Sequence, residues 1–165
     1  MNEHDRLARN ATRMLDLHPA MRTRVAAIIH DLEQEGYRPR IQAAYRSPAD
    51  QLAAYRSGHS KLRWGFHNAT AADGTPEALA VDLLDDDRPL EPTRAYMLAL
   101  ARLAAVQRCQ TGIAWGLPKS LRLGLQRAID THDTSWSKYG WDSLHLEPSD
   151  VTVAAARAGA RPLAP

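Results

Sequence analysis

The chain has 165 residues, of which 44% are hydrophobic and 24% are charged, a composition typical of a soluble globular protein. This length suits one core, so we expect a single domain over residues 1–165. A formal net charge of +2 is too small to indicate a nucleic acid partner. The single cysteine, Cys109, excludes a disulfide within the chain.

The N-terminal residues, 1–6, are mostly polar or charged and lack the apolar segment of a secretory signal peptide. No apolar run approaches membrane-spanning length, so we expect no membrane insertion. We expect a protein made in the cytoplasm, and another system must carry it to any substrate outside the membrane.

The first third of the chain predicts three helices and one strand. A polar helix is expected over residues 1–17, and a second helix should begin at Pro19 and end at Gly36. The alternation in residues 37–45 predicts a strand. Residues 48–57 predict a third helix, because a serine and a proline stand at its start.

The remainder predicts three strands and two helices. Residues 79–84 predict a buried strand, and residues 92–110 form the clearest helical pattern, which includes the cysteine as a small core residue. We expect further strands at residues 111–115 and 144–146, and a helix at residues 121–129.

The alanine-rich tail, residues 149–165, is expected to be frayed. The chain shows no internal repeat and no linker. Helices followed by strands separated by loops, and then by more helices, predict an α+β fold with a small antiparallel sheet flanked by helices.

Three residues far apart in sequence carry groups that could bind a metal. Asp82 is set into the apolar strand expected at residues 79–84, and His145 lies between two leucines of the last expected strand. His67 precedes the polar loop that leads to the strand of Asp82. Two imidazoles and a carboxylate make an open zinc site with a fourth position for water. We expect this site on the face of the sheet.

The same residues also have ordinary structural explanations. A carboxylate in an apolar run is costly without a partner, but an arginine would satisfy Asp82 as well as a metal ion would. A histidine such as His145 is often a hydrogen-bonded core residue. Spacing alone leaves both interpretations open, and His59 and His132 lie near enough to the expected site to be spare ligands.

A hydrolytic site also needs a base. Asp142 lies three residues before His145, an offset that puts the two on opposite faces of a regular strand. We therefore expect Asp142 in the turn that enters the strand. Glu147 lies two residues after His145 on the same face, so it is either a rival base or a partner that orients an imidazole.

Three segments together resemble the zinc peptidases of peptidoglycan: the D-alanyl-D-alanine carboxypeptidases and dipeptidases, and the phage L-alanyl-D-glutamate endopeptidases. The first is Tyr-Arg-Ser-Pro-Ala-Asp-Gln at residues 45–51. The second is His67 followed by Ala-Leu-Ala-Val-Asp-Leu at residues 78–83. The third is Trp-Asp-Ser-Leu-His-Leu-Glu at residues 141–147. The segments span most of the chain.

The resemblance implies that His67, Asp82 and His145 bind zinc and that Asp142 is the catalytic acid/base. An aspartate at that position is similar to some phage endopeptidases, whereas the dipeptidases have glutamate there. Arg46 would steady the polarised carbonyl or a substrate carboxylate.

The resemblance also implies a supporting role in substrate binding for Gln51, and it places Trp115, in the segment 112–116, along the cleft. One departure is the gap of 15 residues between His67 and Asp82, where the family usually has seven, so that about eight residues in the loop 68–76 look inserted. Asp73 would be the ligand if this alignment slipped. Gly65 stands where the family commonly has a serine.

We therefore expect a monomeric zinc peptidase whose partner is a peptidoglycan stem peptide, and specifically an L-alanyl-D-glutamate endopeptidase of the endolysin kind. The alternative enzyme is a D-alanyl-D-alanine carboxypeptidase. Alternatives of another class are a non-catalytic cell-wall-binding module and an interaction domain without a metal. The missing signal favours a phage-type lysin or an effector exported by a machine, acting on the wall after release or export.

Overall fold

The computed structural model describes residues 1–164, and in that range it contains six α-helices, one short 3-10 helix and one four-stranded sheet. The helices are α1 (Glu3–Leu15), α2 (Pro19–Gln34), α3 (Pro48–Arg56), η1 (Phe66–Asn68), α4 (Arg94–Val106), α5 (Lys119–Thr131) and α6 (Val153–Arg157), and the strands are β1 (Pro39–Ala43), β2 (Val81–Asp85), β3 (Cys109–Gly112) and β4 (Asp142–Pro148). The strand order is β1-β2-β4-β3, and every neighbouring pair is antiparallel. The expected α+β fold is confirmed.

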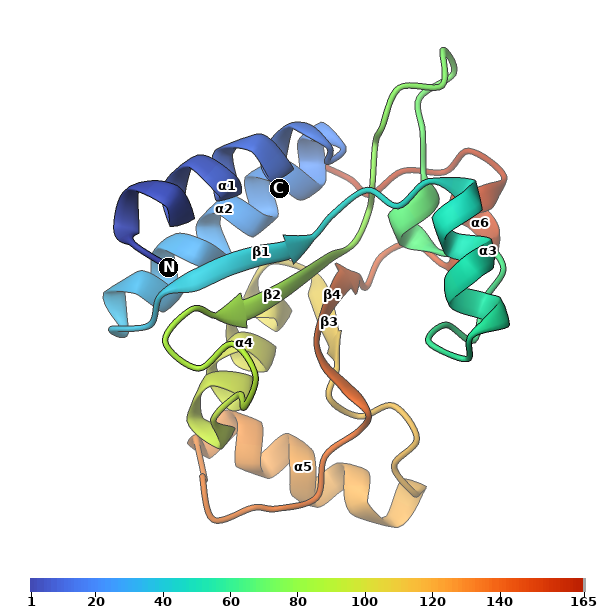
Figure 1. The fold of residues 1–165 in the computed structure, drawn as a ribbon. Helices are drawn as coiled ribbons and strands as arrows, with labels where there is room; N and C mark the ends of the chain where they lie inside the picture. The colour runs from blue at the N-terminus through green and yellow to red at the C-terminus, as the bar shows by residue number, and fades with distance from the viewer. Residues whose placement is uncertain (165) are drawn as a thin grey trace.

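The main core lies between the sheet and the helices α2 and α4, which pack against each other (Figure 1). Val25, Ile28, Ile41, Leu83 and Leu100, from both helices and two strands, are fully buried there. Helix α3 lies at one end of the sheet, beyond the arrowhead of β4 (Figure 1). One face of the sheet is therefore filled with apolar side chains, and the other is available for polar ones.

The early elements follow their sequence signals. Helix α2 starts at Pro19, and Gly36 follows its end with a φ of +86°, a left-handed conformation that suits glycine. Helix α3 starts after Ser47, whose hydroxyl oxygen accepts a hydrogen bond from the backbone N–H of Asp50 at 3.1 Å. No helix among residues 1–164 is both long and apolar enough to cross a membrane.

The prediction of a helix over residues 92–110 was wrong at its C-terminal end. Helix α4 stops at Val106, Arg108 takes a left-handed φ of 53°, and Cys109 opens strand β3. The physical reason is the polar pair at positions 107 and 108, which breaks the apolar helical pattern and turns the chain. Cys109 is a buried residue, as expected, but on a strand rather than on a helix.

Other bounds also shifted. The strand predicted over residues 111–115 ends at Gly112, so that Trp115 lies in a turn. Helix α5 and strand β4 are both longer than predicted, extending to residues 119–131 and 142–148. Pairing with β3 reaches from Asp142 to Pro148 and so extends β4 beyond the short apolar run from which it was predicted.

The prediction of a frayed tail over residues 149–165 was wrong for the part of it that the structure describes, which excludes residue 165. Thr152 caps helix α6 by accepting a hydrogen bond from Ala155 N–H at 3.1 Å. Arg24, 1% exposed, binds both carboxylate oxygens of Asp150 and donates to the carbonyl oxygen of Leu163 at 2.8 Å. A buried guanidinium needs these acceptors, and the tail supplies them.

Helix α1 covers the free edge of β1 with side chains. Asn10 accepts from the N–H of Ile41 at 2.8 Å and donates to the carbonyl oxygen of Pro39 at 3.0 Å. Arg6 donates to the same Pro39 oxygen at 2.7 Å, and Arg9 donates to the Ile41 oxygen at 2.9 Å. These side chains take the place of a neighbouring strand and satisfy an edge that would otherwise pair with other chains.

Replacing the buried amide on this edge should destabilise the fold. In Asn10→Ala the N–H of Ile41 loses its acceptor, so we expect the free energy of unfolding to fall by about 1–3 kcal/mol. Urea denaturation followed by circular dichroism measures this. The control is Thr12→Ala on the exposed side of the same helix, expected to change stability by less than about 0.5 kcal/mol. Equal effects of the two substitutions would contradict the role given to Asn10.

Candidate metal centre and cleft

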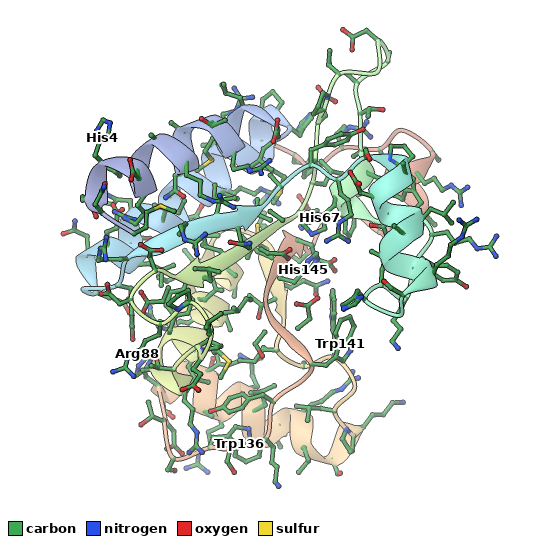
Figure 2. All side chains as sticks on the ribbon, viewed as in Figure 1. His4, His67, Arg88, Trp136, Trp141 and His145 are labelled. Atoms are coloured by element: carbon green, nitrogen blue, oxygen red, sulfur yellow. The ribbon has the colours of Figure 1, made fainter. Side chains whose placement is uncertain are left out.

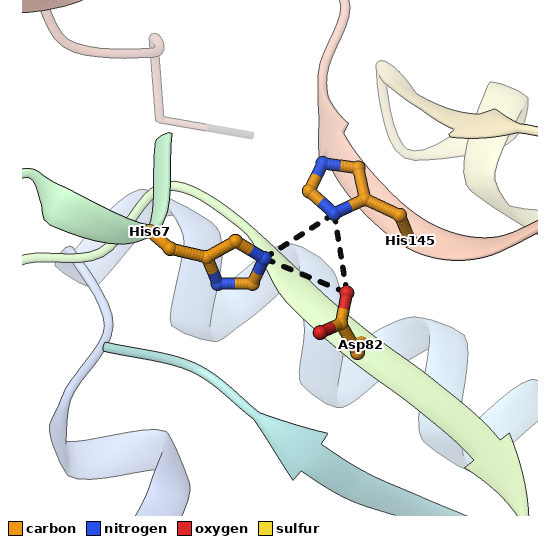
Figure 3. A group of neighbouring side chains, drawn as sticks. All are labelled: His67, Asp82 and His145. Carbon is orange, nitrogen blue, oxygen red and sulfur yellow. Dashed lines mark hydrogen bonds and ion pairs between the residues drawn. The ribbon is translucent and has the colours of Figure 1, made fainter. Parts of the chain in front are cut away.

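Three elements bring the metal-binding candidates together (Figure 3). His67 comes from η1, Asp82 from β2 and His145 from β4, and the register of β2 and β4 pairs Asp82 directly with His145. The Nε2 atom of His67 lies 3.2 Å from Nδ1 of His145, which lies 3.1 Å from Oδ1 of Asp82. The distance from His67 Nε2 to Asp82 Oδ1 is 3.5 Å, so the three atoms form a small triangle.

The outer nitrogen of His67 is held by the backbone. Its Nδ1 lies 2.5 Å from the carbonyl oxygen of Ala44, at the end of β1. A carbonyl oxygen can only accept, so Nδ1 carries a hydrogen, and Nε2 is the ring nitrogen that faces the cluster. The backbone N–H of Arg46 donates to the His67 carbonyl oxygen at 2.9 Å, which fixes η1 beside this strand.

The outer nitrogen of His145 is held by a carboxylate. Its Nε2 lies 3.1 Å from Oε2 of Glu147, two residues along the same face of β4. The other carboxylate oxygen of Glu147 accepts from the Gln110 amide on β3 at 2.9 Å. Glu147 therefore contacts an imidazole as the orienting partner would, one of the two roles left open for it by the sequence.

The spacing of the three inward atoms suits a metal ion. A tetrahedral ion with nitrogen and oxygen ligands at about 2.0–2.2 Å places its ligand atoms about 3.3–3.6 Å apart. The separations of 3.1, 3.2 and 3.5 Å are close to this, and all three side chains are buried or half-buried. Both imidazoles also have their outer nitrogens engaged. The group His67, Asp82 and His145 could therefore hold a metal ion.

The electrostatics favour a positive charge at this point. Burial acts to raise the pKa of Asp82, but hydrogen bonds with His145 and His67 outweigh it and hold that pKa well below its ordinary value. Burial acts to lower the pKa of His145, but hydrogen bonds with Asp82 and Glu147 raise it to about 9. The carboxylates of Asp82 and Glu147 thus stabilise a positive charge at this point. A divalent ion could carry that charge in place of a protonated imidazole.

Asp142 reaches the same side of the sheet because strand β4 is irregular. It is the first residue of the strand, not part of a preceding turn as expected, and it pairs with Gly112 across a break in the register between Thr111 and Gly112. A bulge of this kind re-aims a side chain, which offsets the odd spacing from His145. Asp142 is half-buried, and burial raises the pKa of its carboxyl although the nearby His145 imidazole opposes this.

These groups share one cleft of about 520 Å³. Its lining includes every residue that the sequence proposed for the site: Arg46, Gln51, His67, Asp82, Trp115, Asp142, His145 and Glu147. The guanidinium of Arg46 donates to the Gln51 side-chain oxygen at 3.0 Å. The indole of Trp115 lies against the His145 ring, with centroids 5.1 Å apart.

Sequence reasoning missed part of the lining. Trp141, labelled in Figure 2, is 57% exposed. Its ring centroid lies 5.4 Å from that of Trp115, and both residues line the cleft, so the two indoles form an aromatic wall. Its position next to Asp142 was the available signal. Lys61 also lines the cleft and had no signal, because it lies in a loop without a recognisable pattern. Of the two spare histidines, His59 lines the cleft.

The other spare, His132, lies at the end of α5 and does not line the cleft. Asp73, the alternative ligand, is exposed and accepts hydrogen bonds from Thr75. It belongs to a hairpin closed by the bridge between Thr70 and Pro76, which projects from the molecule in Figure 1. The structure therefore brings Asp82, not Asp73, to the two histidines.

No family model, no curated protein and no solved structure matches this chain.

Removing one imidazole should remove the metal. We expect the purified protein to retain one divalent ion per chain and His145→Ala to retain less than about 0.2, because a site of three ligands loses most of its affinity with one of them. Elemental analysis of protein prepared without chelators measures both. The control is His4→Ala, on the exposed start of α1 and away from the cluster (Figure 2). A metal-free wild-type protein would contradict the assignment.

Proposed function

We propose that this protein is a zinc-dependent peptidase that hydrolyses peptidoglycan stem peptides. The observation that carries the proposal is the cluster of His67, Asp82 and His145 in a cleft that also holds an acid and an arginine. Imidazole and carboxylate are ligands that zinc accepts, and the ligand separations suit its tetrahedral geometry. The three sequence segments that resemble the peptidoglycan peptidases supply the substrate class.

In this proposal the chain holds zinc through His67 Nε2, Asp82 Oδ1 and His145 Nδ1. Zinc in such a three-residue site acts as a Lewis acid toward a carbonyl and lowers the pKa of water to about 7. Asp142 takes the proton of the attacking water and delivers it to the leaving amine. The half-buried carboxyl of Asp142, on the same side of the sheet, supports this role.

Arg46 binds an oxygen of the substrate on the other wall of the cleft. Its side-chain amide partner Gln51 holds the guanidinium in place, so that less conformational freedom is lost on binding. The aromatic wall of Trp115 and Trp141 offers an apolar surface to the peptide. Glu147 holds His145 in the tautomer that presents Nδ1 to the metal.

The bond cut in the preferred form of the proposal is L-alanyl-D-glutamate, because an aspartate at position 142 resembles the phage endopeptidases. A D-alanyl-D-alanine carboxypeptidase is the second form, and Arg46 could bind the terminal carboxylate of its substrate. A non-catalytic wall-binding module would use the same cleft without needing Asp142. In each form we propose that the protein acts on the cell wall after release or export.

Removing the base should stop turnover without removing zinc. We expect Asp142→Asn to lower kcat by at least about 100-fold with zinc content unchanged, because the base is not a ligand. Glu147→Gln, the matched change at the rival base, should act mainly through the metal and weaken zinc affinity about 10–100-fold. Stem-peptide hydrolysis and zinc titration measure the two effects. Near-native activity of Asp142→Asn would move the base to Glu147.

Digestion of purified muropeptides identifies the bond. With added zinc we expect new amino termini at D-glutamate, detected by mass spectrometry, and none from a preparation treated with chelator. Loss of the terminal D-alanine alone would select the carboxypeptidase. Intact muropeptides with wall binding that survives Asp142→Asn would overturn the peptidase and select the binding module.

A further inference from the structure

One buried amide joins two parts of the cleft wall. The side chain of Gln51 is 3% exposed, and its oxygen accepts from Arg46 at 3.0 Å. Its nitrogen donates to the hydroxyl oxygen of Ser60 at 2.8 Å and to the carbonyl oxygen of Leu62 at 2.6 Å. Gln51 therefore fixes the position of Arg46 relative to the loop segment 60–62.

Lys61 lies between the two residues that Gln51 holds. The Ser60 hydroxyl accepts from the Leu62 N–H at 3.2 Å, so the backbone on both sides of Lys61 is tied into one turn. Lys61 is one of the residues that line the cleft. Within residues 1–164 its ammonium has no hydrogen bond or ion pair, which leaves its charge available to a ligand.

The two sides of the cleft carry opposite charges. Its acidic residues, Asp82, Asp142 and Glu147, all come from β2 and β4. Arg46 and Lys61 stand on the other wall, and residues 51–72 contain no aspartate or glutamate at all. A metal ion would offset the acidic side. Asp142 lies near enough to Arg46 for their charges to interact, whereas Lys61 has no ion-pair partner among residues 1–164. A carboxylate of the substrate would offset the charge of Lys61 and the remaining charge of Arg46.

We propose that Arg46 and Lys61 form a two-cation clamp that selects substrates with a free carboxylate beside the scissile bond, and that Gln51 is the residue that positions both. This inference rests on the proposed function and names the substrate feature that the site reads. L-Alanyl-D-glutamate has such a carboxylate when the chain continues through the glutamate side chain. Arginine offers a fixed planar fork, and lysine adds a mobile point charge with longer reach.

The test compares two peptides that differ in one group. The first contains L-alanyl-D-glutamate with its free carboxylate, and the second has a carboxamide in that place. Their affinities are measured by calorimetry with zinc-supplemented Asp142→Asn protein, in which turnover is blocked, and kcat/KM is measured with the otherwise wild-type enzyme. We expect the carboxylate peptide to bind more tightly, with a preference that weakens as salt is added.

Substitutions at position 61 isolate the charge. Lys61→Met should reduce the carboxylate preference about five- to tenfold, chiefly through KM, and Lys61→Arg should restore it. The control Lys119→Met makes the same change on α5, outside the cleft lining, and should leave the preference unaltered. If Lys61→Met and Lys119→Met lost the carboxylate preference equally, the loss would come from the change in net charge, and the clamp would be overturned.

Gln51→Met tests the positioning role, because it keeps the volume and removes all three hydrogen bonds. It should lower the carboxylate preference at least as much as Lys61→Met, and adding Lys61→Met to it should change little more. Fully additive losses would show that Gln51 does not act through Lys61. The melting temperature of each variant separates lost recognition from lost folding.

The outcomes for the clamp and for the peptidase are distinguishable. Equal binding of the two peptides with hydrolysis of both would overturn the clamp and leave the proposed function standing. Selective binding without hydrolysis by wild-type protein would uphold the clamp and overturn the peptidase. Binding of neither peptide would overturn both.

Discussion

The register between β2 and β4 determines the candidate metal centre, because it places Asp82 opposite His145 on one face of the sheet. A slip of one residue would turn one of these side chains into the apolar core between the sheet and its helices, where an unpaired charge is costly. Val81, Leu83 and Leu146 alternate with the ligands and are fully buried on the other face. Burial of these apolar side chains thus fixes the strand register, and the register fixes the positions of Asp82 and His145.

The position of Asp142 depends on a departure from that regularity. Regular pairing would send it to the face opposite His145, and the bulge at Thr111 and Gly112 prevents this. A Cβ atom added to Gly112 would lie 2.4 Å from the Asp142 carbonyl oxygen, so the close approach requires glycine. The position of Asp142 and the pairing of Asp82 with His145 therefore depend on different features: the first on a glycine, the second on strand register.

The sequence predicted what is local or periodic: the fold class, the start of α2 at Pro19 and the placement of Asp82 and His145 in apolar strands. It could not predict that these ligands meet, since their separation is set by strand pairing over more than 60 residues; only the family resemblance suggested it. The tail was misjudged for a similar reason, because the groups that order it, such as Arg24, lie in another part of the chain. The hydrogen bonds from Gln51 to Ser60 and Leu62, on either side of Lys61, likewise have no periodic signal in the sequence.

The 15-residue separation of His67 and Asp82 leaves the cluster intact because both ends of the loop between them are tied. The N–H of Leu79 donates to the Phe66 carbonyl oxygen at 2.9 Å, so η1 and the approach to β2 lie side by side whatever the length of chain between them. The residues between these ends leave the body of the protein as a hairpin, and the length of such a loop costs little, since closure entropy grows slowly with loop length. A change in the length of this loop can therefore alter the surroundings of the cleft without moving His67 or Asp82.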